Sequence, residues 1–298
     1  MSSFAGLAER VTVPEWKTVP QAEASGEPKA ASVFRMIENG LAVAPTVSVV
    51  VPAKNEARNL AHVFASIPAW VDEVLLVDGH SVDDTVAEAQ RLLPDVRIVS
   101  QQGHGKGDAL REGFSACKGD IIVMLDADGS TDGGELPRFV SALMAGADFV
   151  KGSRFASGGG SDDITGTRRL GNWVLSTLVN LLFGTKYTDL CYGYNAFWAH
   201  HLPALDLNCD GFEIETVMNI RAAKVGLRVH EVPSHEHSRV HGQSNLHVAR
   251  DGWRIAKFIV REWLAARGLK RRVVDSPVRE AQVPTAGTPI AELPADNA

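Results

Sequence analysis

Short runs of consecutive apolar residues recur along the first half of the chain, separated by segments with helical spacing. The pattern predicts strands at 47–52, 72–78, 96–99, 120–125 and 148–151, and helices at 56–66, 81–93 (capped by Ser81), 105–117 and 134–145. Strands that are apolar on both faces are typical of the centre of a parallel sheet covered by helices. The alternation therefore predicts an α/β fold that binds ligands beyond the carboxyl ends of its strands.

The two ends of the chain lack this alternation. Residues 1–44 carry three prolines and no sustained period, so we expect a loosely ordered arm with a short helix at 31–39. Residues 269–298 contain four prolines and few large apolar residues, which predicts a disordered tail. A single domain over 45–268 would lie between them.

Composition places the chain among ordinary globular proteins. It has 298 residues, of which 45% are hydrophobic and 22% charged, which excludes a collagen-like, coiled-coil or fully disordered chain. Three cysteines without CxxC spacing argue against a disulfide framework and favour a reducing compartment. We find no secretory signal, and the longest apolar-leaning stretch, 173–183, is about half the ~20 residues of a membrane span. We therefore expect a cytoplasmic protein.

Positive charge is concentrated near the C-terminal end. The chain has a net charge of −6, yet residues 239–272 contain nine Lys or Arg against two acids. Within 246–267, basic residues recur every three or four positions, at Arg250, Arg254, Lys257 and Arg261. We expect an amphipathic helix whose apolar side, Val248, Trp253, Ala256, Val260, Trp263 and Leu264, packs on the domain. Its basic face would then be free to contact an anionic membrane surface.

A nucleic-acid partner is not favoured for this basic segment. Its only aromatic residues suited to stacking on bases are Trp253 and Trp263, which fall on the expected apolar side.

An acidic pair follows the apolar run at 120–125. Asp126 and Asp128 are two residues apart where a strand meets a loop. Carboxylates this close repel each other unless a cation neutralises them, and hard oxygen ligands of this kind suit Mg²⁺ or Mn²⁺. The alternative is a turn in which the aspartates cap the following helix.

The order of several motifs is more specific than this pair. The segments PAKNE (52–56), VDGHSVDDT (77–85), GKGDAL (105–110), DADGS (126–130) and GSRF (152–155) resemble the nucleotide-binding half of a family 2 glycosyltransferase. Further on, TDLCYGYNAF (188–197), GFEIETV (211–217), EVPS (231–234) and RVHGQSN (239–245) resemble the dolichol-phosphate or polyprenyl-phosphate mannosyltransferase-like branch. The resemblance covers residues 45–263. It implies a GT-A (Rossmann-like) fold, in which helices flank a mixed, mostly parallel sheet.

The same resemblance implies roles for the residues that match. The nucleotide-sugar site would comprise Pro52, Asn55, Glu56, Asp78 and Lys106. Asp126 and Asp128 would hold Mg²⁺ or Mn²⁺ against the diphosphate, and His237 would complete the coordination. The residues facing phosphate groups would be Arg154, Arg168 or Arg169, and Arg239, because guanidinium groups bind phosphate oxygens in pairs.

Four positions depart from the family pattern. Gly79 stands where a second aspartate is common, Ser130 where a glutamine often supplies a metal ligand, Asn195 for an arginine and Asn245 for a lysine. These changes affect the expected base and sugar of the donor more than the reaction type.

The reaction implied is inverting transfer of a sugar from a GDP- or UDP-linked donor to a polyprenyl phosphate. A phosphate acceptor is already anionic, so it needs little base catalysis. The alternative is a hydroxyl acceptor in the synthesis of a surface glycan, for which Asp189, Glu213 or Glu215 would act as the base.

Two other interpretations of the sequence, one of its function and one of its histidines, fit less well. A sugar-nucleotide pyrophosphorylase requires a glycine-rich loop with arginine after the first strand, where this chain has Pro52 to Glu56. A zinc site at His235, His237 and His241 lacks a neighbouring acidic or cysteine cluster in the sequence.

Overall fold

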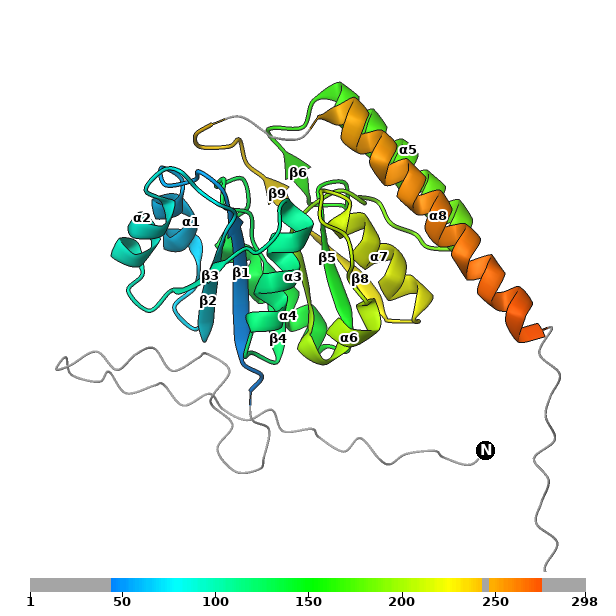
Figure 1. The fold of residues 1–298 in the computed structure, drawn as a ribbon, viewed down its shortest axis with the longest axis horizontal. Coiled ribbons are helices and arrows are strands. Elements are labelled where there is room, and N and C mark those ends of the chain that lie inside the picture. The colour runs from blue at the N-terminus through cyan, green and yellow to red at the C-terminus, as the bar shows by residue number, and fades with distance from the viewer. Residues whose placement is uncertain (1–43, 243–246, 275–298) are drawn as a thin grey trace, which may run out of the picture.

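Seven strands form the central sheet of the structure, a computed structural model that describes residues 44–242 and 247–274 (Figure 1). Their order is β3–β2–β1–β4–β7–β5–β8. β7 is antiparallel to both of its neighbours and all other pairs are parallel, which confirms the expected mixed, mostly parallel sheet. The strands are β1 (Val47–Ala53), β2 (Glu73–Asp78), β3 (Arg97–Ser100), β4 (Ile121–Met124), β5 (Phe149–Ser153), β7 (Asn195–Trp198) and β8 (Val229–Pro233).

Helices cover both faces of this sheet. One face packs against α1 (Leu60–Ser66), α2 (Thr85–Leu92) and α4 (Leu136–Met144), and the other against α3 (Lys106–Ala116), α6 (Leu202–Leu205) and α7 (Ile214–Lys224). β1 explains why the strand runs are continuously apolar: Val49 and Val51 belong to the first core cluster, while Val50 between them belongs to the second. Short 3₁₀ turns at Gly133–Glu135 and Ala199–His201 precede α4 and α6.

Two long helices lie side by side on the outer side of α7 (Figure 1). α5 (Gly166–Phe183) and α8 (Val248–Val274) share a third apolar cluster, to which Leu175, Ile220, Ile255 and Ile259 contribute. A separate two-stranded parallel sheet, β6 (Gly160–Ser161) with β9 (His235–Glu236), lies between this helix pair and the main sheet.

Several helix boundaries differ from those expected. α1 begins at Leu60 instead of residue 56, and the N-cap of α2 is Asp84 instead of Ser81. The Ser81 hydroxyl instead accepts a hydrogen bond from the backbone N–H of Asn55, at 3.0 Å, which ties the turn after β1 to the turn after β2. α8 continues to Val274, past the expected domain end at 268. The short helix expected at 31–39 and residues 275–298 lie outside the described residues.

The packing side of α8 also differs from the expected one. Ile255, Phe258 and Ile259 are buried, whereas Trp253, Val260 and Leu264 are exposed. The expected basic residues, Arg250, Arg254, Lys257 and Arg261, are exposed as well. The solvent face of α8 therefore combines cations with large apolar side chains.

Candidate active site

A cavity of about 730 Å³ opens at the carboxyl ends of the central strands. Most of the predicted site residues line it: Pro52, Asn55, Glu56, Lys106, Asp126, Asp128, Arg154, Arg168 and Arg239. Four others lie outside the lining, namely Asp78, Arg169, Asp189 and His237. The cavity extends from the ends of β1 and β4 to residues of α5 and α8, including Leu175 and Ile255.

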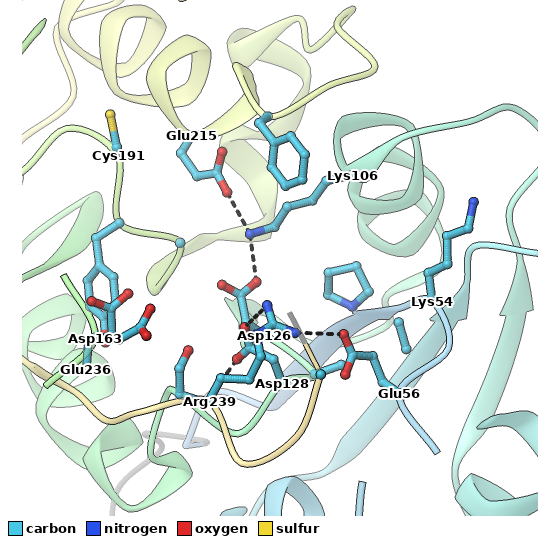
Figure 2. Close-up of a pocket in the computed structure, with 18 of the residues that line it drawn as sticks. Lys54, Glu56, Lys106, Asp126, Asp128, Asp163, Cys191, Glu215, Glu236 and Arg239 are labelled. Carbon is cyan, nitrogen blue, oxygen red and sulfur yellow. Dashed lines mark hydrogen bonds and ion pairs between the residues drawn. The ribbon is translucent and has the colours of Figure 1, made fainter. Parts of the chain in front are cut away.

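Lys106 lies between two acids at the centre of the cavity (Figure 2). Its Nζ is 2.7 Å from Asp126 Oδ1 and 2.8 Å from Glu215 Oε1. Burial alone would lower the pKa of Lys106, but the two carboxylates outweigh it and raise that pKa. Lys106 is the first residue of α3, after Gly105, whose φ of +97° and approach to Asp210 leave no room for a side chain.

Arg239 makes a second bridge between acids in the same cavity (Figure 2). Its Nη2 is 2.6 Å from Asp128 Oδ2 and its Nη1 is 3.2 Å from Glu56 Oε1. The backbone N–H of Val240 donates to the carbonyl of Asp128 at 3.3 Å, so the chain around Arg239 runs along the acidic turn. Each aspartate of the pair is thus bound to a different cationic side chain.

Arg154 is buried between two carboxylates and is not free for an external anion. It donates to Asp189 from Nε at 2.7 Å and from Nη2 at 3.0 Å, and its Nη1 is 3.1 Å from Glu236. Its guanidinium also lies 4.9 Å from the centre of the Tyr192 ring. The phosphate contact that the resemblance implies for Arg154 would have to compete with both ion pairs.

Asp189 is fully buried beside Arg154. Burial would raise the pKa of Asp189, but the hydrogen bonds and charge of Arg154 lower it below its ordinary value. Asp189 therefore stays ionised at neutral pH, where it holds Arg154 in place.

We expect Asp189→Asn to lower the free energy of unfolding by about 3–5 kcal/mol, because it breaks a buried pair with Arg154. Urea denaturation measures this. The control, Asp163→Asn, breaks the exposed 2.8 Å pair with Arg168 and should cost at most about 1 kcal/mol. Equal costs for the two variants would contradict a structural role for Asp189.

The ends of β1 and β2 form the part of the cavity expected to hold the nucleoside. Asn55 has a positive φ of 58°, and its side-chain oxygen accepts a hydrogen bond from the N–H of Val82 at 2.8 Å. Asp78 accepts from the N–H of Ser81 at 3.2 Å, while its neighbour Gly79 lines the cavity. Asp78 thus lies behind the lining and shapes the turn.

The three candidates for a general base have different surroundings. Glu215 lines the cavity and contacts Lys106. Glu213 is buried and pairs with Arg254 of α8 at 2.9 Å. With Asp189 also sealed off, Glu215 is the one of the three whose side chain reaches the cavity.

Two contacts were not expected from the sequence. Glu236 lines the cavity and pairs with Arg154, but its place between two histidines gave no sign of burial. His237 was expected to complete the metal site, but it lies outside the cavity lining: its Nδ1 is 3.7 Å from Asp162, and its backbone N–H donates to the carbonyl of Ser130.

Comparisons with known proteins place the chain in one family of enzymes. The family model described as glycosyl transferase family 2 matches residues 48–202. Glycosyltransferase AglJ of Haloferax volcanii is 32% identical over 69% of this chain and 68% of its own length. Undecaprenyl-phosphate mannosyltransferase of Micrococcus luteus is 32% identical over 76% of this chain and 98% of its own length.

A solved structure shares the fold. Glucosyl-3-phosphoglycerate synthase of Mycobacterium tuberculosis, crystallised with Mn²⁺, UDP and phosphoglyceric acid, superposes with a TM-score of 0.59 at 24% identity, covering 74% of this chain and 78% of its own. With the family model spanning the strands that form the cavity, the chain belongs to glycosyl transferase family 2 and is a glycosyltransferase of the GT-A fold.

Proposed function

We propose that this glycosyltransferase uses a divalent metal ion to transfer a sugar, with inversion, from a nucleoside-diphosphate sugar to a polyprenyl phosphate. The observation that carries the proposal is the arrangement of Asp126 and Asp128 in one cavity, each opposite a separate cationic side chain. The M. luteus relative, named an undecaprenyl-phosphate mannosyltransferase, supports the choice of acceptor.

The acidic pair fits Mg²⁺ or Mn²⁺. Both aspartates offer hard carboxylate oxygens on one short turn, which suits hard divalent ions of this kind. A bound metal ion would stabilise the negative charge that develops on the departing diphosphate. Among the residues described, Asp126 and Asp128 are the acids that would hold it.

Lys106 and Arg239 would bind the diphosphate of the donor. Without a divalent ion, their charges neutralise the aspartates at 2.7 and 2.6 Å. With a metal ion held by these carboxylates, the ammonium and guanidinium groups would be free to contact phosphate oxygens. Preorganised cations at the leaving group are a large source of rate enhancement, because they need not reorganise during the reaction.

The part of the cavity lined by α5 and α8 suits a lipid-linked acceptor. It is lined by Leu175 of α5 and Ile255 of α8, with Arg168 of α5 nearby. The exposed side chains of the same helices include Leu170, Trp173 and Trp253. An arginine beside an apolar wall matches a phosphate attached to a hydrocarbon chain, and such an acceptor needs little base catalysis.

The surface of this helix pair would meet the membrane. No helix among the described residues is long and apolar enough to span a bilayer. Trp173 and Trp253 are exposed by 64% and 66%, and Lys257 Nζ lies 5.9 Å from the centre of the Trp253 ring. Aromatic and basic side chains on one helix surface are typical of binding in the headgroup region of anionic membranes.

A hydroxyl acceptor is the second candidate. It is favoured by the single observation that Glu215 reaches the cavity, where it would have to leave Lys106 to accept a proton. A base-dependent transfer would fail in Glu215→Gln, whereas transfer to a phosphate acceptor would continue at a reduced rate.

Donor calorimetry tests the nucleotide part of the proposal. We expect GDP or UDP to bind in the presence of Mn²⁺ and to bind much more weakly in excess chelator. Equal affinities with and without the metal would contradict the proposed role of the acidic pair.

Lys106→Met tests the exchange between metal ion and ammonium. With the ammonium removed, Asp126 and Glu215 face each other unneutralised, so in chelator we expect the Tm to fall by about 6–12 °C. Mn²⁺ should raise the Tm of this variant more than that of the unchanged protein. Lys54→Met, at another lysine of the cavity lining, is the control. The same Mn²⁺ shift in all three proteins would contradict the exchange.

A further inference from the structure

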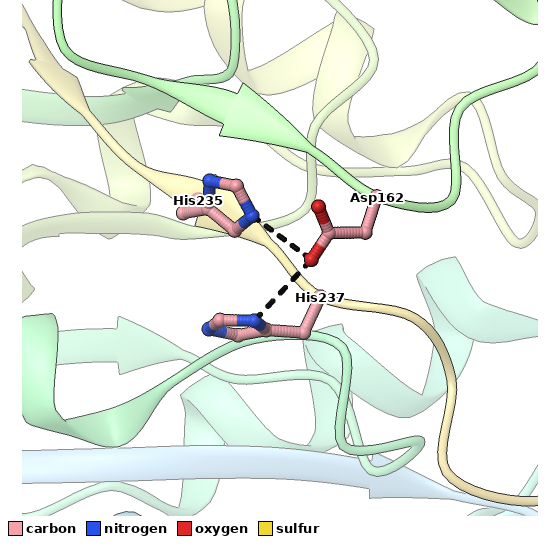
Figure 3. A group of neighbouring side chains, drawn as sticks. All are labelled: Asp162, His235 and His237. Atoms are coloured by element: carbon pink, nitrogen blue, oxygen red, sulfur yellow. Dashed lines mark ion pairs between the residues drawn. The ribbon is translucent and has the colours of Figure 1, made fainter.

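A group of metal-ligating side chains lies outside the cavity, on the two-stranded sheet (Figure 3). Asp162 Oδ2 is 3.0 Å from Nε2 of His235 and 3.7 Å from Nδ1 of His237. One ligand atom from each residue lies within 4.8 Å of the other two. None of the three residues lines the cavity that holds Asp126 and Asp128.

The register of the small sheet explains why these residues meet. β6 pairs with β9 in parallel, Gly160 opposite His235 and Ser161 opposite Glu236. The N–H of Asp162 then donates to the carbonyl of Glu236 at 2.8 Å, which brings Asp162 beside the two histidines.

Alternation along β9 separates the histidines from the residue between them. Successive side chains of a strand point to opposite faces. Glu236 is buried and binds Arg154, so His235 and His237 both face outward, toward Asp162. The buried ion pair fixes which side of the strand carries the imidazoles.

Gly160 leaves room for one of these rings. A Cβ at position 160 would lie 2.6 Å from Nδ1 of His235, so any larger residue would push the imidazole away. The ring therefore lies over the glycine while its Nε2 faces Asp162. The zinc site disfavoured from sequence spacing lacked an acidic cluster beside the histidines, and Glu236 between them is bound to Arg154; the fold supplies Asp162, from 73 positions before His235.

We propose that Asp162, His235 and His237 form a second metal site, which binds Zn²⁺ or a similar transition-metal ion. Two imidazole nitrogens and one carboxylate oxygen are a ligand set of zinc proteins, whereas Mg²⁺ prefers oxygen ligands alone. Side-chain exposures of 42–54% leave the remaining coordination positions open to water. This second metal site would be present whichever molecule accepts the sugar.

Such an ion would connect two segments that carry cavity residues. The cavity is lined by Asp163 and Arg168, which follow Asp162 in the chain, and by Arg239, which follows His237. A metal ion that joins β6 to β9 would stiffen both segments at once. The alternative is a metal-free cluster in which Asp162 simply accepts hydrogen bonds from the N–H groups of the two imidazoles.

Zinc titration of the full chain, with any histidine tag removed, tests the proposal. Calorimetry in excess Mg²⁺ should give one equivalent of bound Zn²⁺. His235→Ala and Asp162→Asn should each weaken binding at least about tenfold, because each removes a ligand. Asp128→Asn should leave Zn²⁺ binding intact, because it alters the Asp126–Asp128 pair in the cavity and not this site. His230→Ala, at an exposed histidine of β8, should also leave it intact.

Chemical modification of the unchanged protein gives a second readout that no folding defect can affect. Zn²⁺ should protect His235 and His237, but not His230, from diethylpyrocarbonate, as mapped by mass spectrometry. The proposal is wrong if Zn²⁺ protects neither histidine, or if His235→Ala and Asp162→Asn bind Zn²⁺ as the unchanged protein does. In that case the three residues form only a hydrogen-bonded cluster.

Discussion

Asp128→Asn should lower sugar transfer by about a hundredfold or more and leave the fold intact. The amide keeps the shape of the side chain and can still accept the hydrogen bond that Asp128 Oδ1 receives from the N–H of Ser130 at 2.9 Å. It removes the charge that would bind the metal ion and that now pairs with Arg239 at 2.6 Å. Initial rates of transfer, with Mn²⁺ and donor in excess, measure the effect.

A matched substitution separates this effect from a general loss of negative charge. Asp84→Asn makes the same chemical change at the start of α2, where the exposed side chain makes no capping hydrogen bond. It should retain near-normal activity and an unchanged Tm. If Asp128→Asn stayed within about twofold of the unchanged protein, the acidic pair would not be the metal site.

Charge reversal on α8 should remove the protein from anionic membranes. Lys257 and Arg261 are exposed, and neither has an ion-pair partner among the described residues, unlike Arg254, which holds the buried Glu213. Near an anionic leaflet each cation contributes about 1 kcal/mol, so Lys257→Glu with Arg261→Glu should weaken vesicle binding at least about thirtyfold. Sedimentation with vesicles containing anionic lipid measures this.

The control reverses two charges on a different surface. Arg91→Glu with Lys118→Glu changes the net charge equally, at exposed positions of α2 and of the turn before β4. This variant should still bind vesicles, and salt should release both it and the unchanged protein. Equal loss of binding in both double variants would point to net charge, not to the surface of α8.

The sequence pattern predicted the first part of the sheet well, because its central strands β1 and β4 are buried on both faces. Continuous runs such as 47–52 and 120–125 allow few other interpretations. Helix starts were less accurate. Residues 56–59 have helical spacing, yet Glu56 turns toward Arg239 and Asn59 donates to the carbonyl of His241 at 3.3 Å, so α1 begins later.

The motifs named most of the residues that line the cavity, but not the contacts that these residues make with one another. Motifs indicated that Arg154 and Asp189 belong to the site, but only the fold shows that they neutralise each other. The acid that joins His235 and His237 was equally hidden, since a local spacing carries no information about a strand 73 positions away. The helical spacing correctly predicted a helix at α8, but it did not reveal which apolar residues would pack and which would stay exposed.

Transfer of a labelled sugar to a lipid phosphate is the measurement that tests the proposed reaction itself. Purified protein would be incubated with Mn²⁺, a panel of GDP- and UDP-linked sugars, and vesicles that contain polyprenyl phosphate, beside a parallel set of soluble hydroxyl acceptors. We expect label from one donor to enter the lipid fraction as a polyprenyl-phosphate sugar, in a reaction that chelator and Asp128→Asn abolish. Label on a soluble hydroxyl acceptor, with none on the lipid phosphate under any donor, would contradict this expectation.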